Sequence, residues 1–473
     1  MEIETKYTTQ SNLLRCYRTI GAFAGTQPAT CHIVGKALHL MVPIDRSFIS
    51  YDITRKIDFL YRSVDFAEKI QSVHMRNYTA IVVTEHSVYI ESEIKSFDQI
   101  EIAGTISSSL LFGQHLLITT ENYMTIIDVE NKSIFKKITI PCQSPKIFHP
   151  REYLNKVLLI SENQMFLMNI NTEKVLFTFT FAEKIVDVAQ SPDVDVHAIA
   201  LANNEIVLHD IRQNKRIGVM INSEKPTRIG FVNGLPNDDL FLIVGSEIGM
   251  INVLSIKNNT IIGTLFQHTK RVHTIITFPN ELHFVTVGED NAIRQYMIDP
   301  NCGTLVPNMI RERSGHPEKP IYVKITGNNV VTGSRDGSLR VSSLFDPMLT
   351  KELSQKIQQK AKRNAVENSK MKLSPVNCID INERYFFVRN TIVSTHERRN
   401  VAVTWDEMRY RIGENKFMTS IVDKTDPSKR KHSSAQHLER NGKEYTQATS
   451  CCFSHCGNFV LVGNNNGIID TNN

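Results

Sequence analysis

Three cysteines and a histidine lie close together near the end of the sequence: Cys451, Cys452, His455 and Cys456. Thiolates and imidazoles are the usual ligands of structural zinc, which is commonly held by two separated pairs of them. Here the four candidates crowd into one short stretch, and Cys451 and Cys452 would point to opposite faces of a strand. We therefore predict no metal site and no cofactor. The other cysteines are scattered, which favours free thiols in a reducing compartment.

A histidine, a serine and an aspartate form a second set that resembles a hydrolase constellation. His316 precedes one strand-like run, Ser334 ends the next run, and Asp336 lies in the turn behind it. His268 and Asp290 occupy corresponding places in the preceding stretch. Catalysis needs one copy of such a set, whereas this pattern occurs in neighbouring units. We therefore interpret these residues as polar groups that lock each unit. Since the sequence also has no glycine-rich phosphate loop, H-E-x-x-H or G-x-S-x-G element, we predict no catalytic residue.

A basic tract follows these units. Residues 351–374 contain seven basic side chains against two acidic ones, with no Gly or Pro. Clustered cations release counterions from a polyanion, so the tract is a candidate contact for RNA phosphates. The alternatives are a solvated linker or, for basic clusters such as Lys429–Lys431, a nuclear-import signal. The candidate RNA-contact residues are Lys356, Lys360, Lys362, Arg363, Lys370 and Lys372.

The residues named above lie in or between short apolar runs that are typical of β-strands. In each of several units, two apolar runs of about 5–6 residues flank a polar turn, as expected of strands in a hairpin. The residue that ends the third strand of a unit recurs in steps of 41 to 45 residues. A period of roughly 40–45 residues with four strands per unit predicts a WD-type β-propeller of seven or eight blades. A β-sandwich array is the alternative, but it predicts more variable spacing. The recurring residues are Asp128, Asn169, Asp210, Ser255, Asp299 and Ser343.

The repeats break after the basic tract. We expect residues 1–350 to form the propeller, 351–374 a basic insertion or linker, and 375–473 the beginning of a second, incomplete propeller. An open blade leaves unpaired strand edges. The chain is therefore expected to be C-terminally truncated, or its last units to join the first ring or a partner. The first repeat, at about residues 17–60, belongs to the first propeller or could instead close the second ring.

Composition limits the class of protein. The 473 residues carry 54 Lys and Arg against 49 Asp and Glu, a formal net charge of +5, which excludes a strongly basic nucleic-acid-binding domain. A hydrophobic content of 41% excludes wholesale disorder. No run approaches the roughly 18 apolar residues of a membrane span, and the first residues have no apolar core typical of a secretory signal. We expect a soluble intracellular protein with no membrane partner.

Several segments together resemble one known family. GEDNAIRQYMID (288–299), RERSGHPEKP (311–320) and TGSRDGSLRVSS (332–343) are similar to consecutive segments of the Utp-twenty-one family of WD-repeat proteins. STHERRNVAVTW (394–405) and ATSCCFSHCGNFVLVGNNNGIID (448–470) follow in the expected order, and YRTIGAFAGTQPAT (17–30) fits at the start. Members of this family are U3 small-nucleolar-RNA-associated proteins of the small-subunit processome.

The resemblance implies a non-catalytic scaffold of ribosome biogenesis, located in the nucleus and nucleolus. Its implied partners are other WD-repeat proteins of the UTP-B subcomplex, together with U3 RNA and precursor ribosomal RNA, and no small-molecule substrate. Family members continue through a complete second propeller and a helical domain, which this sequence lacks. The alternatives are a propeller enzyme or an interaction adaptor in another pathway, such as a ubiquitin-ligase substrate receptor or a coat subunit.

Overall fold

The chain forms two compact units. The computed structural model describes residues 19–93, 96–233, 240–278, 281–299, 306–354, 373–382, 390–407, 409–419, 421–422, 430–431 and 446–472. One unit comprises Phe23–Pro317, and the other comprises Glu318–Asn473 with Met1–Ala22. We call the first unit the ring and the second the C-terminal unit. All regular secondary structure in the described residues is β-strand. These residues contain no helix long and apolar enough to cross a membrane.

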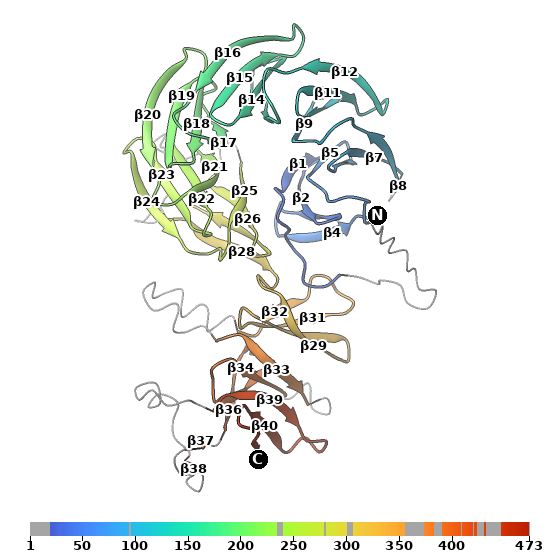
Figure 1. The fold of residues 1–473 in the computed structure, drawn as a ribbon, viewed down its shortest axis with the longest axis vertical. Coiled ribbons are helices and arrows are strands. Elements are labelled where there is room, and N and C mark those ends of the chain that lie inside the picture. The colour runs from blue at the N-terminus through green and yellow to red at the C-terminus, as the bar shows by residue number, and fades with distance from the viewer. Residues whose placement is uncertain are drawn as a thin grey trace, which may run out of the picture. The chain divides into compact units, whose positions relative to one another are not determined.

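The ring contains seven four-stranded antiparallel sheets, arranged one after another around a circle (Figure 1). Each sheet consists of four consecutive strands. The first four sheets are β1 (Thr30–Val34), β2 (Ala37–Ile44), β3 (Ser47–Asp52), β4 (Asp58–Arg62); β5 (Ser72–Arg76), β6 (Thr79–Val83), β7 (Ser87–Glu93), β8 (Ser96–Glu101); β9 (Ser108–Phe112), β10 (His115–Thr119), β11 (Tyr123–Asp128), β12 (Ser133–Thr139); and β13 (Lys146–Phe148), β14 (Lys156–Ser161), β15 (Gln164–Asn169), β16 (Lys174–Thr180). The other three are β17 (Ile185–Gln190), β18 (Val196–Leu201), β19 (Glu205–Asp210), β20 (Lys215–Ile221); β21 (Pro226–Val232), β22 (Phe241–Ser246), β23 (Ile251–Ser255), β24 (Thr260–Leu265); and β25 (Val272–Thr277), β26 (His283–Gly288), β27 (Ala292–Met297), β28 (Asn308–Ser314).

The recurring residue of the sequence has a local structural reason. Asp128, Asn169, Asp210 and Ser255 are the last residues of third strands, as predicted, whereas Asp299 lies two residues beyond the end of β27. At the end of β11, Asp128 Oδ1 accepts hydrogen bonds from the backbone N–H groups of Glu130 and Asn131, at 2.9 and 3.0 Å. Asp210 does the same at the end of β19. A short side chain that accepts from backbone two or three residues on stabilises the turn into the fourth strand.

Hydrophobic clusters show that the ring closes on itself. Each sheet packs against the next one through a buried cluster of alternate strand residues. A seventh cluster joins the first sheet to the last, with Leu40 and Tyr51 packed against Val285, Val287 and Ile293. Seven sheets joined by seven clusters form a closed ring.

The C-terminal unit has three larger sheets and one short hairpin among its described residues. Two clusters join the three sheets, and Trp405 is fully buried in the first cluster. The strands are β29 (Pro320–Thr326), β30 (Asn329–Ser334), β31 (Leu339–Ser343), β32 (Thr350–Glu352); β33 (Val376–Ile381), β34 (Ile392–His396), β35 (Val401–Asp406), β36 (Arg411–Met418); β37 (Ile421–Val422), β38 (Arg430–Lys431); and β39 (Ala448–Phe453), β40 (Val460–Asn464), β41 (Ile469–Asn472).

This division differs from the domain boundary that the sequence suggested near residue 350. The compact units divide between Pro317 and Glu318, and the sheet β29–β32 shares a core with β33–β36. The sequence left open which ring the first repeat, at about residues 17–60, completes. In the structure β2 and β3 of this repeat pack against β26 and β27 and complete the ring of Phe23–Pro317. Most of the proposed insertion, residues 355–372, lies outside the described residues.

Candidate functional site

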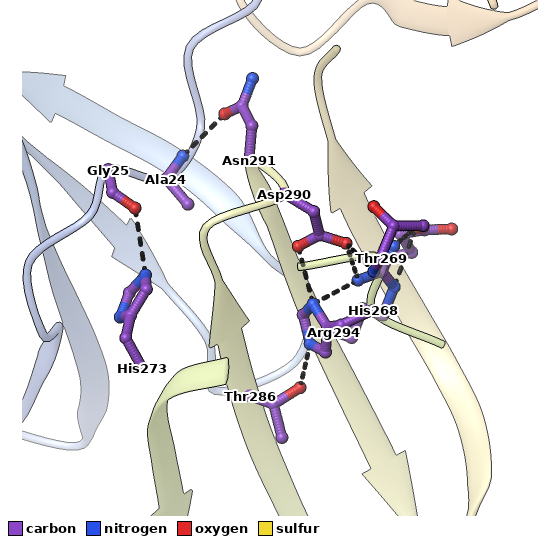
Figure 2. A network of polar contacts seen from close by, with 10 residues as sticks. Ala24, Gly25, His268, Thr269, His273, Thr286, Asp290, Asn291 and Arg294 are labelled. Carbon is purple, nitrogen blue, oxygen red and sulfur yellow. Dashed lines mark hydrogen bonds and ion pairs between the residues drawn. The ribbon is translucent and has the colours of Figure 1, made fainter. Parts of the chain in front are cut away.

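A buried polar network lies at one end of the sheet β25–β28 (Figure 2). His268 precedes β25, Asp290 lies in the turn between β26 and β27, and Arg294 is on β27. His268 Nδ1 lies 2.7 Å from Asp290 Oδ1, and Arg294 Nη1 lies 2.9 Å from Asp290 Oδ2. Thr286 Oγ1 is 2.8 Å from His268 Nε2, and Arg294 Nη2 is 2.7 Å from Glu312 Oε1 on β28. The network therefore fastens three strands and the preceding loop together. We call it the β25–β28 lock.

Burial fixes the charges of this lock. The side chains of His268 and Asp290 are 0% and 2% exposed. Burial, reinforced by Arg294, lowers the pKa of His268, so the imidazole of His268 is neutral at physiological pH. Burial alone would raise the pKa of Asp290, but contacts with His268 and Arg294 hold it well below its usual range. His268 Nδ1 lies within hydrogen-bond distance of Asp290 and of Arg294 Nη1, and Nε2 lies within that distance of Thr286, so neither imidazole nitrogen remains to act on a substrate.

Gly288 is required beside this lock. It ends β26, and a Cβ placed on it would lie 2.5 Å from His268 Nδ1 and 2.6 Å from Asp290 Oδ1. Any larger residue would push apart the two atoms that hydrogen-bond to each other.

The same turn also fastens the closure of the ring. Asn291 Oδ1 accepts hydrogen bonds from the backbone N–H groups of Phe23 and Ala24, at 2.7 and 3.0 Å. On the neighbouring strand, His273 Nε2 lies 3.1 Å from Gly25 O. Figure 2 shows this contact beside that of Asn291 with Ala24. These contacts bridge about 250 residues of sequence and bind the segment before β1 to the last sheet.

Ser334 and Asp336 of the second predicted set lie in the C-terminal unit. Ser334 Oγ donates to the carbonyl oxygens of Glu318 and Lys319, each at 3.1 Å. Asp336 accepts from the backbone N–H and the hydroxyl of Ser338, at 3.1 and 2.7 Å. His316 belongs to the ring, where its backbone carbonyl accepts from Asn291 Nδ2 at 3.2 Å. Ser334 thus donates its proton to backbone oxygens, as a structural serine does.

Sequence reasoning missed the arginines of both sets. Arg294 follows Asp290 by four residues, and Arg340 follows Asp336 by the same interval. Arg340 Nη2 lies 2.8 Å from Glu352 Oε2, with both side chains under a tenth exposed, which parallels the Arg294–Glu312 pair. An Asp-x-x-x-Arg spacing across a hairpin turn was the available signal, because it places an arginine on the strand that leaves the turn.

The cysteine cluster is divided between two environments. Cys451 and Cys452 lie on β39, where the first is buried and the second exposed, so they point to opposite faces of the sheet. His455 and Cys456 lie in the turn that follows β39. In the part of the chain that the structure describes, no group of three or more His, Cys, Asp or Glu side chains is placed to hold a metal ion. The six candidate RNA-contact residues, Lys356 to Lys372, all lie outside the described residues.

Buried histidines predict acid sensitivity of the ring. Burial lowers the pKa of His74 to about 3 and those of His197 and His273 to about 4, with Arg228 also lowering that of His273. An unfolded histidine titrates near 6.5, so between about pH 6.5 and 4 the unfolded chain binds protons that the folded chain excludes. Stability should therefore fall as the pH falls through this window, by up to about 3 kcal/mol for each histidine.

Urea unfolding followed by far-ultraviolet circular dichroism at pH 7, 5.5 and 4.5 measures this dependence. His273→Gln should reduce the slope of stability against pH. Equal free energies of unfolding at pH 7 and 4.5 would contradict the prediction, because they would mean that these histidines bind protons in the folded chain as readily as in the unfolded chain.

The four-stranded sheets, their regular period and the buried histidine–aspartate lock define this chain as a WD-repeat β-propeller protein. Residues 40–299, more than half of the chain, match the family described as the WDR36/Utp21 first beta-propeller. The chain belongs to the WDR36/Utp21 family.

Three relatives align with nearly the whole chain. It is 24% identical to U3 small nucleolar RNA-associated protein 21 of Saccharomyces cerevisiae, over 97% of this chain and 49% of that protein. It is 23% identical to the Schizosaccharomyces pombe homolog, over 100% of this chain and 51% of that protein. It is 24% identical to human WD repeat-containing protein 36, over 100% of this chain and 52% of that protein. The chain therefore spans about half the length of the relatives it matches.

Proposed function

We propose that this chain is a non-catalytic scaffold of ribosome biogenesis, which acts with U3 RNA in processing the small-subunit precursor rRNA. The observation that carries the proposal is the alignment, over nearly the whole chain, with two proteins named for their association with U3 small nucleolar RNA. The proposed location is the nucleolus, and the proposed protein partners are WD-repeat proteins of the UTP-B subcomplex.

The polar sites of the structure support a structural role over a catalytic one. Acid–base catalysis needs a titratable group within reach of a substrate. The His268 side chain is 0% exposed and hydrogen-bonded at both nitrogens, and Ser334 Oγ donates to two backbone carbonyls. Both arrangements hold strands together and leave no nucleophile or base facing solvent.

Affinity capture of the tagged chain from its native cells tests the proposal. We expect U3 RNA, precursor rRNA and other WD-repeat processome proteins to be recovered at physiological salt. Recovery of ubiquitin-ligase or coat subunits without U3 RNA would instead support the adaptor function. An untagged strain and a tagged, unrelated propeller are the matched controls.

The basic tract is the proposed direct contact with RNA. Changing Lys356, Lys360, Lys362, Arg363, Lys370 and Lys372 together to Ser should lower RNA affinity and flatten its dependence on salt, because fewer counterions are released on binding. RNA affinity of the purified chain at 50 and 200 mM salt measures both effects. An unchanged affinity and salt slope would remove the tract from the interface.

A further inference from the structure

The first strands of the seven sheets surround a central cavity in the ring. Two adjoining hollows, of about 570 and 480 Å³, share the residues Pro28, Phe148, Asp187, Val188 and Arg228. Their walls include residues of β1, β5, β9, β13, β17, β21 and β25. The cavity lies entirely within Phe23–Pro317.

The charges that line this cavity are unbalanced. Lys146, Arg151 and Arg228 line it, against a single acidic residue, Asp187. Both oxygens of Asp187 are already engaged, one by Arg228 Nη1 and the other by the Ile229 N–H, each at 2.9 Å. Asp187 therefore compensates the charge of Arg228, and the positive charges of Lys146 and Arg151 are not compensated by an acidic residue of the lining.

The contacts of the two remaining cations are with neutral groups among the described residues. Lys146 Nζ donates to Val186 O at 3.0 Å. Arg151 donates to Gln190 Oε1 at 3.3 Å and to Ser191 O at 3.0 Å. An ammonium group has three donors, so Lys146 can bind a further acceptor without giving up its present bond.

Lys146 lies in a field of like charges. Burial lowers its pKa first, Arg228 lowers it further, and Arg271 and Lys184 add to the effect against the opposing Asp187. An anion placed there would be attracted by several cations at once and would relieve their mutual repulsion.

The lining favours a carboxylate on a peptide over RNA. Single-stranded RNA binds through exposed aromatic side chains on which bases stack, and through cations that follow many phosphates. The aromatic residues of the larger hollow are packed into the protein. Phe231 and Phe278 are 7% and 8% exposed, and Phe148 contacts His197 edge-on, with 6.0 Å between the ring centres. Three cations can pair with only a few anionic groups.

We propose that the central cavity of the ring binds a short acidic segment of a partner protein, with one carboxylate held by Lys146. This goes beyond the proposed scaffold function and does not depend on the RNA contact, which is assigned to the basic tract. Ser108 lines the same hollow; its Oγ accepts from the Ile147 N–H at 3.3 Å, so its hydroxyl proton can be donated to the segment.

Fluorescence anisotropy with the full chain tests this proposal. The probe is a labelled Gly-Asp-Glu-Asp-Glu-Gly peptide, compared with Gly-Asn-Gln-Asn-Gln-Gly and with a 12-nucleotide uridine oligomer. We expect the acidic peptide to bind at least about tenfold more tightly than the neutral one, as a charge-assisted contact would give. Lys146→Gln should lose about tenfold in affinity, and Lys146→Arg should recover most of it.

Lys174→Gln, on the exposed start of β16, is the matched control and should bind as the unchanged chain does. Circular dichroism of each variant shows whether the ring is still folded. Equal binding of the acidic and neutral peptides would overturn the proposal, and so would full affinity in Lys146→Gln. Binding of the RNA oligomer that Lys146→Gln abolishes, without peptide binding, would assign the cavity to RNA instead.

Discussion

Replacing Asp290 by Ala should lower the free energy of unfolding of the ring by about 3–5 kcal/mol. The change removes the acceptor of His268 and Arg294 and leaves the Arg294 guanidinium buried with one acidic partner fewer. An uncompensated buried charge is costlier than the loss of the pair itself. Hydrogen exchange of peptides from β26 and β27 measures the effect, because it reports opening of this sheet rather than of the whole chain.

Asp98→Ala is the matched control for this prediction. Asp98 forms an ion pair with Lys132, but its side chain is 52% exposed. Exposed pairs contribute about 0–1 kcal/mol, so this variant should exchange almost as the unchanged chain does. If Asp290→Ala were no more destabilising than Asp98→Ala, the β25–β28 lock would not stabilise the ring.

Replacing Trp405 by Ala should destabilise the C-terminal unit by about 3–5 kcal/mol. Trp405 is fully buried on β35, and its indole N–H donates to Ser394 Oγ at 2.7 Å. The change opens a large cavity in the cluster that joins the sheets β29–β32 and β33–β36. Hydrogen exchange of peptides from β34 and β35 should increase, while peptides from β9 to β20 in the ring keep their protection.

Trp405→Phe separates packing from hydrogen bonding in the same place. It keeps most of the buried volume and loses the bond to Ser394, so we expect a smaller cost of about 1–2 kcal/mol. Faster exchange throughout β9 to β20 in Trp405→Ala would contradict the division of the chain into two units that unfold separately.

The period of the blades could be predicted because it depends on local chemistry. Asp128, Asn169 and Asp210 each accept hydrogen bonds from backbone within the next three residues, so the same residue types recur at the same place. The residue before each is buried whether it is Ile127, Met168 or His209. This position therefore requires a buried side chain and not one particular residue type, which explains why the strand pattern persists although the residue changes.

The closure of the ring could not be predicted from local patterns. It depends on contacts such as Asn291 with Ala24 and His273 with Gly25, between segments about 250 residues apart. Nothing near residues 17–60 indicates which ring that unit completes. The cavity was missed for a similar reason, because Lys146, Asp187 and Arg228 come together only when three separate sheets are placed side by side.

Depletion of this chain from its native cells, followed by measurement of ribosomal RNA precursors, tests the proposed function most directly. The account predicts that unprocessed small-subunit precursor accumulates and mature small-subunit rRNA falls, while large-subunit rRNA stays nearly constant at first. Expression of the unchanged chain should restore processing. Normal levels of small-subunit precursor and mature rRNA after complete depletion would contradict a role in U3-dependent ribosome biogenesis.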